Sequence, residues 1–102
     1  RLYLALQDGA PAGCIALRKL DAKRCELKRL YVRPAFRRRG LARLLTEQII
    51  RDARAIGYRR ILLDTLPFLE SAIRLYRSLG FTDAPRYNNS PLDTTLFLQL
   101  DL

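Results

Sequence analysis

The sequence predicts a mixed α/β (α+β) fold, a β-sheet flanked by helices with the element order βββ-α-β-α-ββ. Three observations predict it: alternating apolar segments near both ends of the chain, two segments with apolar residues at helical spacing, and a short continuous apolar run between those two segments. The length of 102 residues fits one domain, residues 1–102. The strand, helix and strand in the middle of this order form a parallel unit with a right-handed connection.

The first two elements form a predicted β-hairpin. Leu alternates with Tyr and Ala in residues 1–7, and the Asp-Gly pair at positions 8–9 marks a turn. A second apolar run follows over residues 13–20. Because only a short turn separates the two strands, we expect them to pair with each other.

The third strand carries a change of phase. Cys25 and Leu27 share one face, whereas Leu30 and Val32 lie one residue out of phase with them. This phase slip indicates a β-bulge near Lys28-Arg29. A bulge leaves backbone N–H groups unpaired with the neighbouring strand, so they become available to a ligand.

The first helix and the fourth strand follow. Pro34 closes the third strand, and the helix extends from near Gly40 to Gly57. Its apolar residues at helical spacing are Leu41, Leu45, Ile49, Ala53 and Ile56. The next apolar run is Ile61-Leu62-Leu63, the pattern of a strand that is buried on both faces beside a crossover helix.

The second helix is expected to begin at Pro67 and to end at Gly80. Its apolar stripe consists of Ala72, Leu75, Tyr76 and Leu79. Residues 82–87 are a weak strand, and residues 88–91 are a turn. Residues 94–102 alternate clearly, and the side chains expected to point inward are Leu96, Leu98, Leu100 and Leu102.

The composition favours an anionic partner. The chain has 19 Lys and Arg residues against 10 Asp and Glu residues, a formal net charge of +9, and Arg dominates the basic set. Nucleic acid and a small phosphorylated ligand both fit. No apolar run approaches the roughly 18 residues of a membrane span and no signal peptide opens the chain, so we expect a cytoplasmic protein without a membrane partner. Because a strand pattern starts at Arg1, we expect the natural N-terminus and part of the active site to be absent.

Missing residue types exclude several kinds of site. The chain contains no His, Met or Trp and only two Cys. Zinc sites built on Cys and His, catalytic triads with His, and disulfide-stapled folds are therefore excluded or disfavoured, and we expect no metal. Cys14 and Cys25 lie in apolar segments, as small buried residues do in a reducing compartment.

A run of arginines before the first helix is a candidate anion site. Arg37, Arg38 and Arg39 precede Gly40, and the N–H groups and positive dipole end of a helix bind anions. Gly40 lets a phosphate approach the backbone closely, and the small Ala42 keeps bulk out of the first turn. The alternative from these residues alone is a solvated basic turn.

This segment and two others resemble the GNAT superfamily of acetyl-CoA-dependent N-acetyltransferases. The family's pyrophosphate motif is Gln or Arg, two residues, Gly, one residue, and Gly or Ala, and it is matched by Arg37-Arg38-Arg39-Gly40-Leu41-Ala42. The family's strand and turn resemble Leu30-Tyr31-Val32-Arg33-Pro34. The second signature is similar to Ala72-Ile73-Arg74-Leu75-Tyr76-Arg77-Ser78-Leu79-Gly80-Phe81. Order and spacing also fit, and the resemblance covers essentially the whole chain.

The resemblance implies acetyl-CoA as the co-substrate and assigns residues to it. The backbone that would hold the pantetheine arm belongs to Leu30, Tyr31 and Val32. The residues that would hold the pyrophosphate are Arg37, Arg38, Arg39, Gly40, Leu41 and Ala42. Many members carry an Asn that contacts the coenzyme at the position of Ser71, where serine can still form a hydrogen bond. In the family an N-terminal strand and helices shape much of the acceptor pocket, and we expect this sequence to lack them.

Tyr76 is the candidate general acid. It matches the family's tyrosine that points toward the coenzyme A sulfur, and a phenol that is neutral at pH 7 can donate a proton to a departing thiolate. The alternative is a purely apolar role for Tyr76 in the helix stripe with Leu75 and Leu79.

Glu26 is the candidate general base, because an amine acceptor must lose a proton before it attacks the thioester. Some relatives place a glutamate that works through water on this strand. The alternative is an exposed strand carboxylate paired with Lys28 or Arg24. Asp64, on the adjacent buried strand, is a weaker candidate.

These observations predict that the chain is an N-acetyltransferase. It would transfer the acetyl group of acetyl-CoA to a primary amine, which attacks the thioester directly in a ternary complex. The acceptor, a small molecule or a peptide amine, is unidentified. One alternative is a basic module that binds nucleic acid around Arg37, Arg59 and Arg60, although its aromatic residues do not interleave with the arginines. Another is a domain that binds acetyl-CoA without turnover. The strand over residues 94–102 is a candidate edge for a homodimer.

Overall fold

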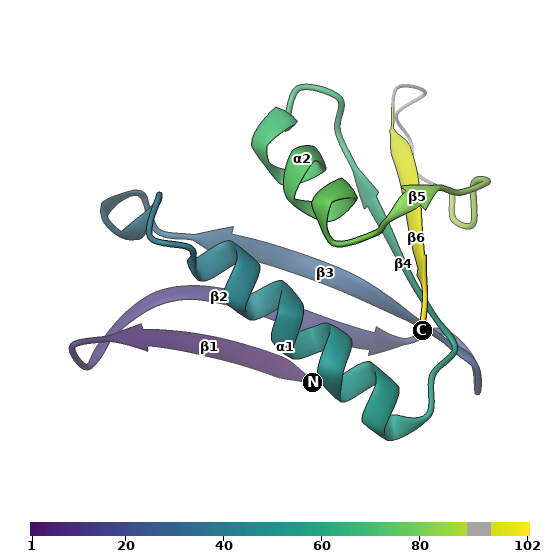
Figure 1. The fold of residues 1–102 in the computed structure, drawn as a ribbon, viewed down its shortest axis with the longest axis horizontal. Helices are drawn as coiled ribbons and strands as arrows, with labels where there is room; N and C mark the ends of the chain where they lie inside the picture. Colours follow the sequence, from purple (N-terminus) through teal and green to yellow (C-terminus); the bar gives the residue numbers. More distant parts are fainter. Residues whose placement is uncertain (90–94) are drawn as a thin grey trace.

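The computed structural model describes residues 1–89 and 95–102 as a mixed sheet with two α-helices packed on one face (Figure 1). The elements in chain order are β1 (Leu2–Gln7), β2 (Ala10–Lys19), β3 (Arg24–Val32), the 3-10 turn η1 (Pro34–Phe36), α1 (Leu41–Ile56), β4 (Arg60–Thr65), α2 (Glu70–Ser78), β5 (Thr82–Asp83) and β6 (Leu96–Asp101). The predicted order βββ-α-β-α-ββ is confirmed.

The six strands are arranged in the order β1-β2-β3-β4-β6-β5. The pair β3–β4 is parallel, as predicted for strands joined by a crossover helix, and the other described pairs are antiparallel. The strand expected at the sheet edge, β6, lies between β4 and β5, so that expectation is wrong. β5 pairs with β6 through Thr82 and Asp83 only, which explains its weak sequence signal. The predicted turn at residues 88–91 and the start of the last strand at residue 94 fall partly outside the described residues.

The helix boundaries agree with the sequence at three of four ends. Gly40 and Gly57 flank α1 in the left-handed region, with φ of +77° and +107°. α2 begins at Glu70 and not at Pro67, because the chain first makes a turn in which the Leu69 N–H donates to the Leu66 carbonyl at 3.0 Å.

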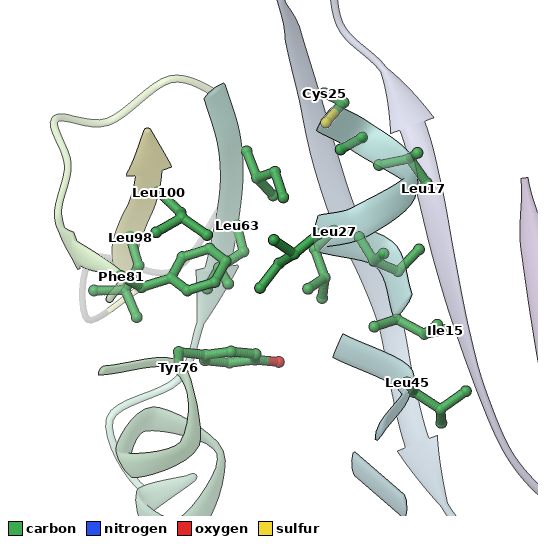
Figure 2. Close-up of a cluster of buried hydrophobic side chains, with 14 residues drawn as sticks. Ile15, Leu17, Cys25, Leu27, Leu45, Leu63, Tyr76, Phe81, Leu98 and Leu100 are labelled. Atoms are coloured by element: carbon green, nitrogen blue, oxygen red, sulfur yellow. The ribbon is translucent and has the colours of Figure 1, made fainter. Parts of the chain in front are cut away.

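The core lies between the sheet and the two helices. α1 contributes its stripe of Leu45, Thr46, Ile49, Ile50 and Ala53, while Ile56 in its last turn is exposed. Figure 2 shows Tyr76 and Phe81 on one side of this core and Leu27 and Leu45 on the other.

The alternating leucines of β1 and β6 differ in their burial. In β1 the residues that pack against the core are Tyr3 and Ala5, whereas the exposed ones are Leu2, Leu4 and Leu6. In β6, Leu98 and Leu100 are buried as expected, but Leu96 is exposed.

The predicted bulge is present in β3. Cys14 of β2 is opposite Tyr31, but Ala16, two residues on, is opposite Lys28, so two residues of β3 face one of β2. Arg29 lies in the bulge with φ of +57°, a left-handed conformation that few non-glycine residues adopt. The bulge changes which residues of β3 face the core, as the phase slip in the sequence indicated.

Gly13 lets β2 approach β3 closely just beyond the bulge. A Cβ atom at Gly13 would lie 2.6 Å from the Tyr31 carbonyl oxygen and 3.3 Å from the Val32 Cα. Both neighbours are backbone atoms, so a side chain at this position would push the two strands apart.

We expect Gly13→Ala to lower the free energy of unfolding by about 1–3 kcal/mol, the usual cost of overpacking. Chemical denaturation followed by circular dichroism measures this change. The control is Cys14→Ala on the same strand, which removes only a half-buried thiol that lies 3.5 Å from the Arg29 carbonyl. Equal stability of Gly13→Ala and the unaltered chain would contradict the close approach of the two backbones.

Candidate active site

A cleft opens where β3 and β4 separate. Among the described residues these strands pair only between 24–26 and 60–62, and beyond this point they diverge (Figure 1). The resulting cleft has a volume of about 310 Å³. It is lined by Leu27, Lys28, Arg29, Leu30, Asp64, Thr65, Leu66, Leu69, Ala72, Tyr76 and Thr95. The cleft therefore contains the bulge of β3, the end of β4 and one side of α2.

The edge of β3 that faces the cleft offers backbone groups to a ligand. Beyond the bulge, Tyr31 and Val32 still pair with β2, and the Arg33 N–H donates to the Ala12 carbonyl at 2.8 Å. The opposite edge has no pairing with β4 in the described part of the chain. Of the three residues expected to hold a pantetheine arm, Leu30 lines the cleft, and Tyr31 and Val32 continue the same strand toward α1.

The loop between β3 and α1 is fastened to the sheet by its own arginines. The Nε of Arg37 donates to the Val32 carbonyl at 3.0 Å, and its guanidinium lies 5.8 Å from the ring centre of Tyr31. The Nη1 of Arg33 donates to the Pro11 carbonyl at 3.0 Å. The Arg39 guanidinium lies 5.7 Å from the ring centre of Phe36. These contacts order a segment that carries several positive charges.

The backbone of this loop turns sharply into α1. Arg38 has φ of +64° and Gly40 has φ of +77°. A Cβ at Gly40 would meet no protein atom within 4 Å, so the backbone conformation, and not crowding within the chain, favours glycine here. The first turn of α1, beginning at Leu41 and Ala42, contains no acidic residue, and its N–H groups have no partner within the helix. Free N–H groups, the positive end of the helix dipole and the arginines are the features by which helix N-termini bind anions, so this turn stays the candidate anion site.

Tyr76 lies at the inner wall of the cleft. It belongs to the buried core, with its ring centre 5.6 Å from that of Phe81, and it also lines the cleft. Figure 2 shows its hydroxyl pointing away from Phe81, toward the part of the core that contains Leu27. Burial raises the pKa of Tyr76 to about 12. The phenol therefore stays protonated at neutral pH, as a proton donor must.

Ser71 lies outside the cleft lining. It is exposed in the first turn of α2, next to Glu70. The two helices are instead joined near the anion site, where Arg43 donates to the Ser78 hydroxyl at 2.7 Å.

Glu26 is buried, so the expectation of an exposed strand carboxylate is wrong. It lies on the sheet face opposite the helices, because its neighbours Cys25 and Leu27 belong to the core. Lys28 Nζ lies 3.4 Å from Glu26 and 3.6 Å from Asp64, so one ammonium group bridges two carboxylates. Arg24, the other expected partner, pairs with Asp21 at 2.8 Å. Only Asp64 of the two bridged carboxylates lines the cleft.

Sequence reasoning missed two polar residues beside these carboxylates. The hydroxyl of Tyr87 donates to Glu26, and the side-chain amide of Asn88 donates to Asp64 at 2.7 Å. Both follow β5 and come from a segment that crosses to the face opposite the helices. The sequence shows them only as polar and aromatic residues after a weak strand, so they carried no signal of this contact.

Within residues 1–89 and 95–102, no group of three or more Cys, Asp and Glu side chains is arranged to hold a metal ion. No helix in that part of the chain is long and apolar enough to cross a membrane.

Comparison with known proteins gives the class of this chain. Residues 1–81 match the model of the acetyltransferase (GNAT) family. The chain therefore belongs to the GNAT family, as its motifs indicated.

Individual relatives agree with this assignment. An uncharacterised N-acetyltransferase of Schizosaccharomyces pombe is 37% identical over 94% of this chain and 60% of its own length. An IAA acetyltransferase of Azospirillum brasilense is 34% identical over 100% of this chain and 68% of its own length. The chain thus spans about two thirds or less of the length of these relatives.

Solved structures share the fold. The ribosomal-protein-S18-alanine N-acetyltransferase of Escherichia coli aligns with a TM-score of 0.85 and 26% identity, over 99% of this chain and 68% of that one. A GNAT family acetyltransferase of Elizabethkingia anophelis with acetyl-CoA bound aligns with a TM-score of 0.87 over 99% of this chain and 75% of that one. At 24% identity, the second likeness concerns the fold alone.

The raised pKa of Tyr76 makes stability depend on pH. Between its ordinary value of 10 and about 12, the folded chain keeps a proton that the unfolded chain has lost, so the free energy of unfolding falls as pH rises through this range. We expect this fall to be smaller by roughly 2–3 kcal/mol in Tyr76→Phe. Denaturant titrations at pH 9 and pH 12 on both proteins measure the difference. The same pH dependence in both would contradict the burial of this phenol.

Proposed function

We propose that this chain binds acetyl-CoA in the cleft between β3 and β4 and transfers the acetyl group to a primary amine. The observation that carries the proposal is the succession of three features: a buried, protonated phenol in the cleft, an unpaired edge of β3 beside it, and a basic helix N-terminus where that strand ends. Family membership supports the same reaction.

Each part of acetyl-CoA has a matching part of the site. The pyrophosphate is placed at the residues of the β3–α1 loop and helix start, Arg37, Arg38, Arg39, Gly40, Leu41 and Ala42. The amide groups of the pantetheine arm extend the sheet along Leu30, Tyr31 and Val32, where β4 has moved away. Ser71, exposed on α2, is a more peripheral contact. The thioester then lies deep in the cleft, near Tyr76.

The reaction needs no covalent enzyme intermediate. The amine nitrogen attacks the thioester carbonyl carbon, a C–N bond forms, and the C–S bond breaks as the tetrahedral intermediate collapses. Tyr76 donates its proton to the departing sulfur and is reprotonated from solvent. A backbone N–H near Leu30 stabilises the oxyanion. The products are an acetamide and coenzyme A, and an acceptor that arrives as an ammonium ion releases one net proton.

The base is proposed to be one of the two carboxylates bridged by Lys28. Glu26 is the candidate that the sequence indicated, and Asp64 is the one that lines the cleft. The nitrogen becomes acidic as its lone pair bonds to carbon, so a carboxylate can accept its proton at that stage.

Two alternatives have less support. A nucleic-acid module would need a continuous basic surface, but Arg59 and Arg60 follow the C-terminal end of α1, about 24 Å from the arginines at its other end. Arg60 is also paired with Asp101 at 2.7 Å. A domain that binds acetyl-CoA without turnover would lack a use for the phenol and the carboxylates around the cleft.

The acceptor stays unassigned within the class of primary amines, either a small molecule or a peptide. The proteins similar to this chain include an IAA acetyltransferase and a ribosomal-protein-S18-alanine N-acetyltransferase, so similar folds act on different acceptors. Homodimer formation also stays a proposal, without β6 as its edge.

Gly40→Ala tests the cofactor site. Because a Cβ there points into open space beside the helix N-terminus, we expect it to weaken acetyl-CoA binding roughly tenfold or more by isothermal titration calorimetry. Gly57→Ala is the matched control: it lies at the other end of α1, also has positive φ, and also meets no atom within 4 Å. Equal acetyl-CoA affinity of the two variants would contradict a pyrophosphate site at Gly40.

Tyr76→Phe tests the acid. We expect kcat to fall by about 100-fold or more while the dissociation constant for acetyl-CoA changes little, because the hydroxyl acts on the leaving sulfur. The measurement is coenzyme A release with a panel of primary amines, alongside calorimetry with acetyl-CoA. An unchanged kcat for any amine that the unaltered chain acetylates would refute the assigned role.

A further inference from the structure

The sheet face opposite the helices holds a connected set of polar side chains. Tyr87 donates to Glu26 Oε2, Lys28 bridges Glu26 Oε2 and Asp64 Oδ2, and Asn88 donates to Asp64 Oδ2 at 2.7 Å. Three strand positions and one crossing segment thus meet at one place. The contacts therefore connect the buried carboxylate of Glu26, through the Lys28 ammonium group, to the carboxylate of Asp64 in the cleft.

The two carboxylates differ in their access to the cleft. The Glu26 side chain is 3% exposed and is absent from the cleft lining, whereas that of Asp64 is 26% exposed and lines the cleft together with Tyr76. The contacts to Lys28 and Asn88 both use Oδ2 of Asp64, and its Oδ1 takes part in neither. An amine that enters the cleft therefore meets Asp64 before Glu26.

Tyr87 is held beside Glu26 by its packing on the sheet. Its ring packs edge-on against Phe97 of β6, with ring centres 5.5 Å apart, and the Arg86 guanidinium lies 5.0 Å from the centre of that same Phe97 ring. Burial first, and then the hydrogen bond to Glu26, raise the pKa of Tyr87. The phenol is therefore a permanent donor to Glu26 over the whole neutral range.

Titratable side chains surround Glu26, and they come from several elements. Arg18 of β2 is its cross-strand partner, Lys28 is on its own strand, Asp64 is on β4, and Tyr87 follows β5. On β6, the residues opposite Leu62 and Asp64 are Gln99 and Phe97, and neither is charged. With Tyr87 donating to Glu26, Lys28 is shared between the two carboxylates and is not drawn to Glu26 alone.

We propose that Tyr87 is a positioning residue of the transfer site. Its hydrogen bond holds Glu26, so the Lys28 ammonium group stays shared between Glu26 and Asp64. Asp64 is thereby fixed in the lining of the cleft as the carboxylate that binds the amine acceptor. This inference rests on the proposed acetyl transfer. Asp64 Oδ1 accepts a hydrogen bond from the acceptor nitrogen. An acceptor that arrives as an ammonium ion first loses one proton to solvent, and Asp64 takes a second proton as the neutral nitrogen bonds to the thioester carbon. Tyr76 supplies the proton to the departing sulfur.

The test uses the whole chain with Tyr87→Phe and a matched control, Tyr3→Phe. Tyr3 also donates its hydroxyl to a carboxylate, that of Asp52, but on the helix side of the sheet and away from the cleft. The probe is propylammonium, titrated with and without saturating acetyl-CoA while the side-chain carboxyl carbons of Asp64 and Glu26 are followed by NMR.

In the unaltered chain we expect propylammonium to shift the Asp64 carboxyl carbon and to leave that of Glu26 in place. Tyr87→Phe should weaken probe binding by at least about tenfold and leave the dissociation constant for acetyl-CoA within twofold, and Tyr3→Phe should change neither. A merely structural role for Tyr87 would weaken both ligands together. Equal probe affinity in Tyr87→Phe and Tyr3→Phe, or a shift at Glu26 in place of Asp64, would overturn the proposal.

Asn88→Ala provides a second variant, because it removes a direct contact of Asp64 and leaves Tyr87 in place. It should weaken probe binding in the same way, and an unchanged affinity would also overturn the proposal. Glu26→Gln should lower the pKa of Tyr87, which reports the contact in solution. Failure of the unaltered chain to bind acetyl-CoA would instead refute the proposed function. The two failures can be told apart because the titration without acetyl-CoA measures binding of propylammonium at Asp64 by itself.

Discussion

The separation of β3 from β4 is the constraint on which the rest of the site depends. Parallel pairing ends at Glu26 and Leu62, and the two strands then open a wedge in the sheet. An open wedge leaves strand edges and apolar faces without partners, which costs free energy unless other groups fill it. Tyr76, which belongs to the core, lines this opening from its inner side, and the rest of it is left as the cleft. The same opening that weakens the sheet creates room for a ligand.

The bulge at Arg29 and the close approach at Gly13 keep β3 attached to β2 while it leaves β4. α1 then begins where β3 ends, so the free strand edge and the positive end of the helix lie in succession along one path. A ligand with amide groups at one end and phosphates at the other matches this path. Its reactive end would meet Tyr76, which burial keeps protonated.

Much of this could be predicted from local sequence. The order of elements follows from periodicity, and the bulge follows from the slip between Leu27 and Leu30. Local patterns could not show that Glu26 is buried or which side chain it contacts, because Tyr87 is 61 residues away and approaches only after the chain crosses the sheet. The position of β6 inside the sheet was missed for a related reason: the signal of the short strand at Thr82 does not show that it pairs along the outer edge of β6.

The central claim is that β3 beyond the bulge and the start of α1 form one binding path for acetyl-CoA. Titration of the ¹⁵N-labelled chain with acetyl-CoA, followed through its backbone amide resonances, tests the claim most directly. The account predicts saturable shifts concentrated at residues 30–32 and 38–43, with small changes at Arg59 and Arg60. Saturable shifts concentrated at Arg59 and Arg60, or no shifts along β3, would contradict it.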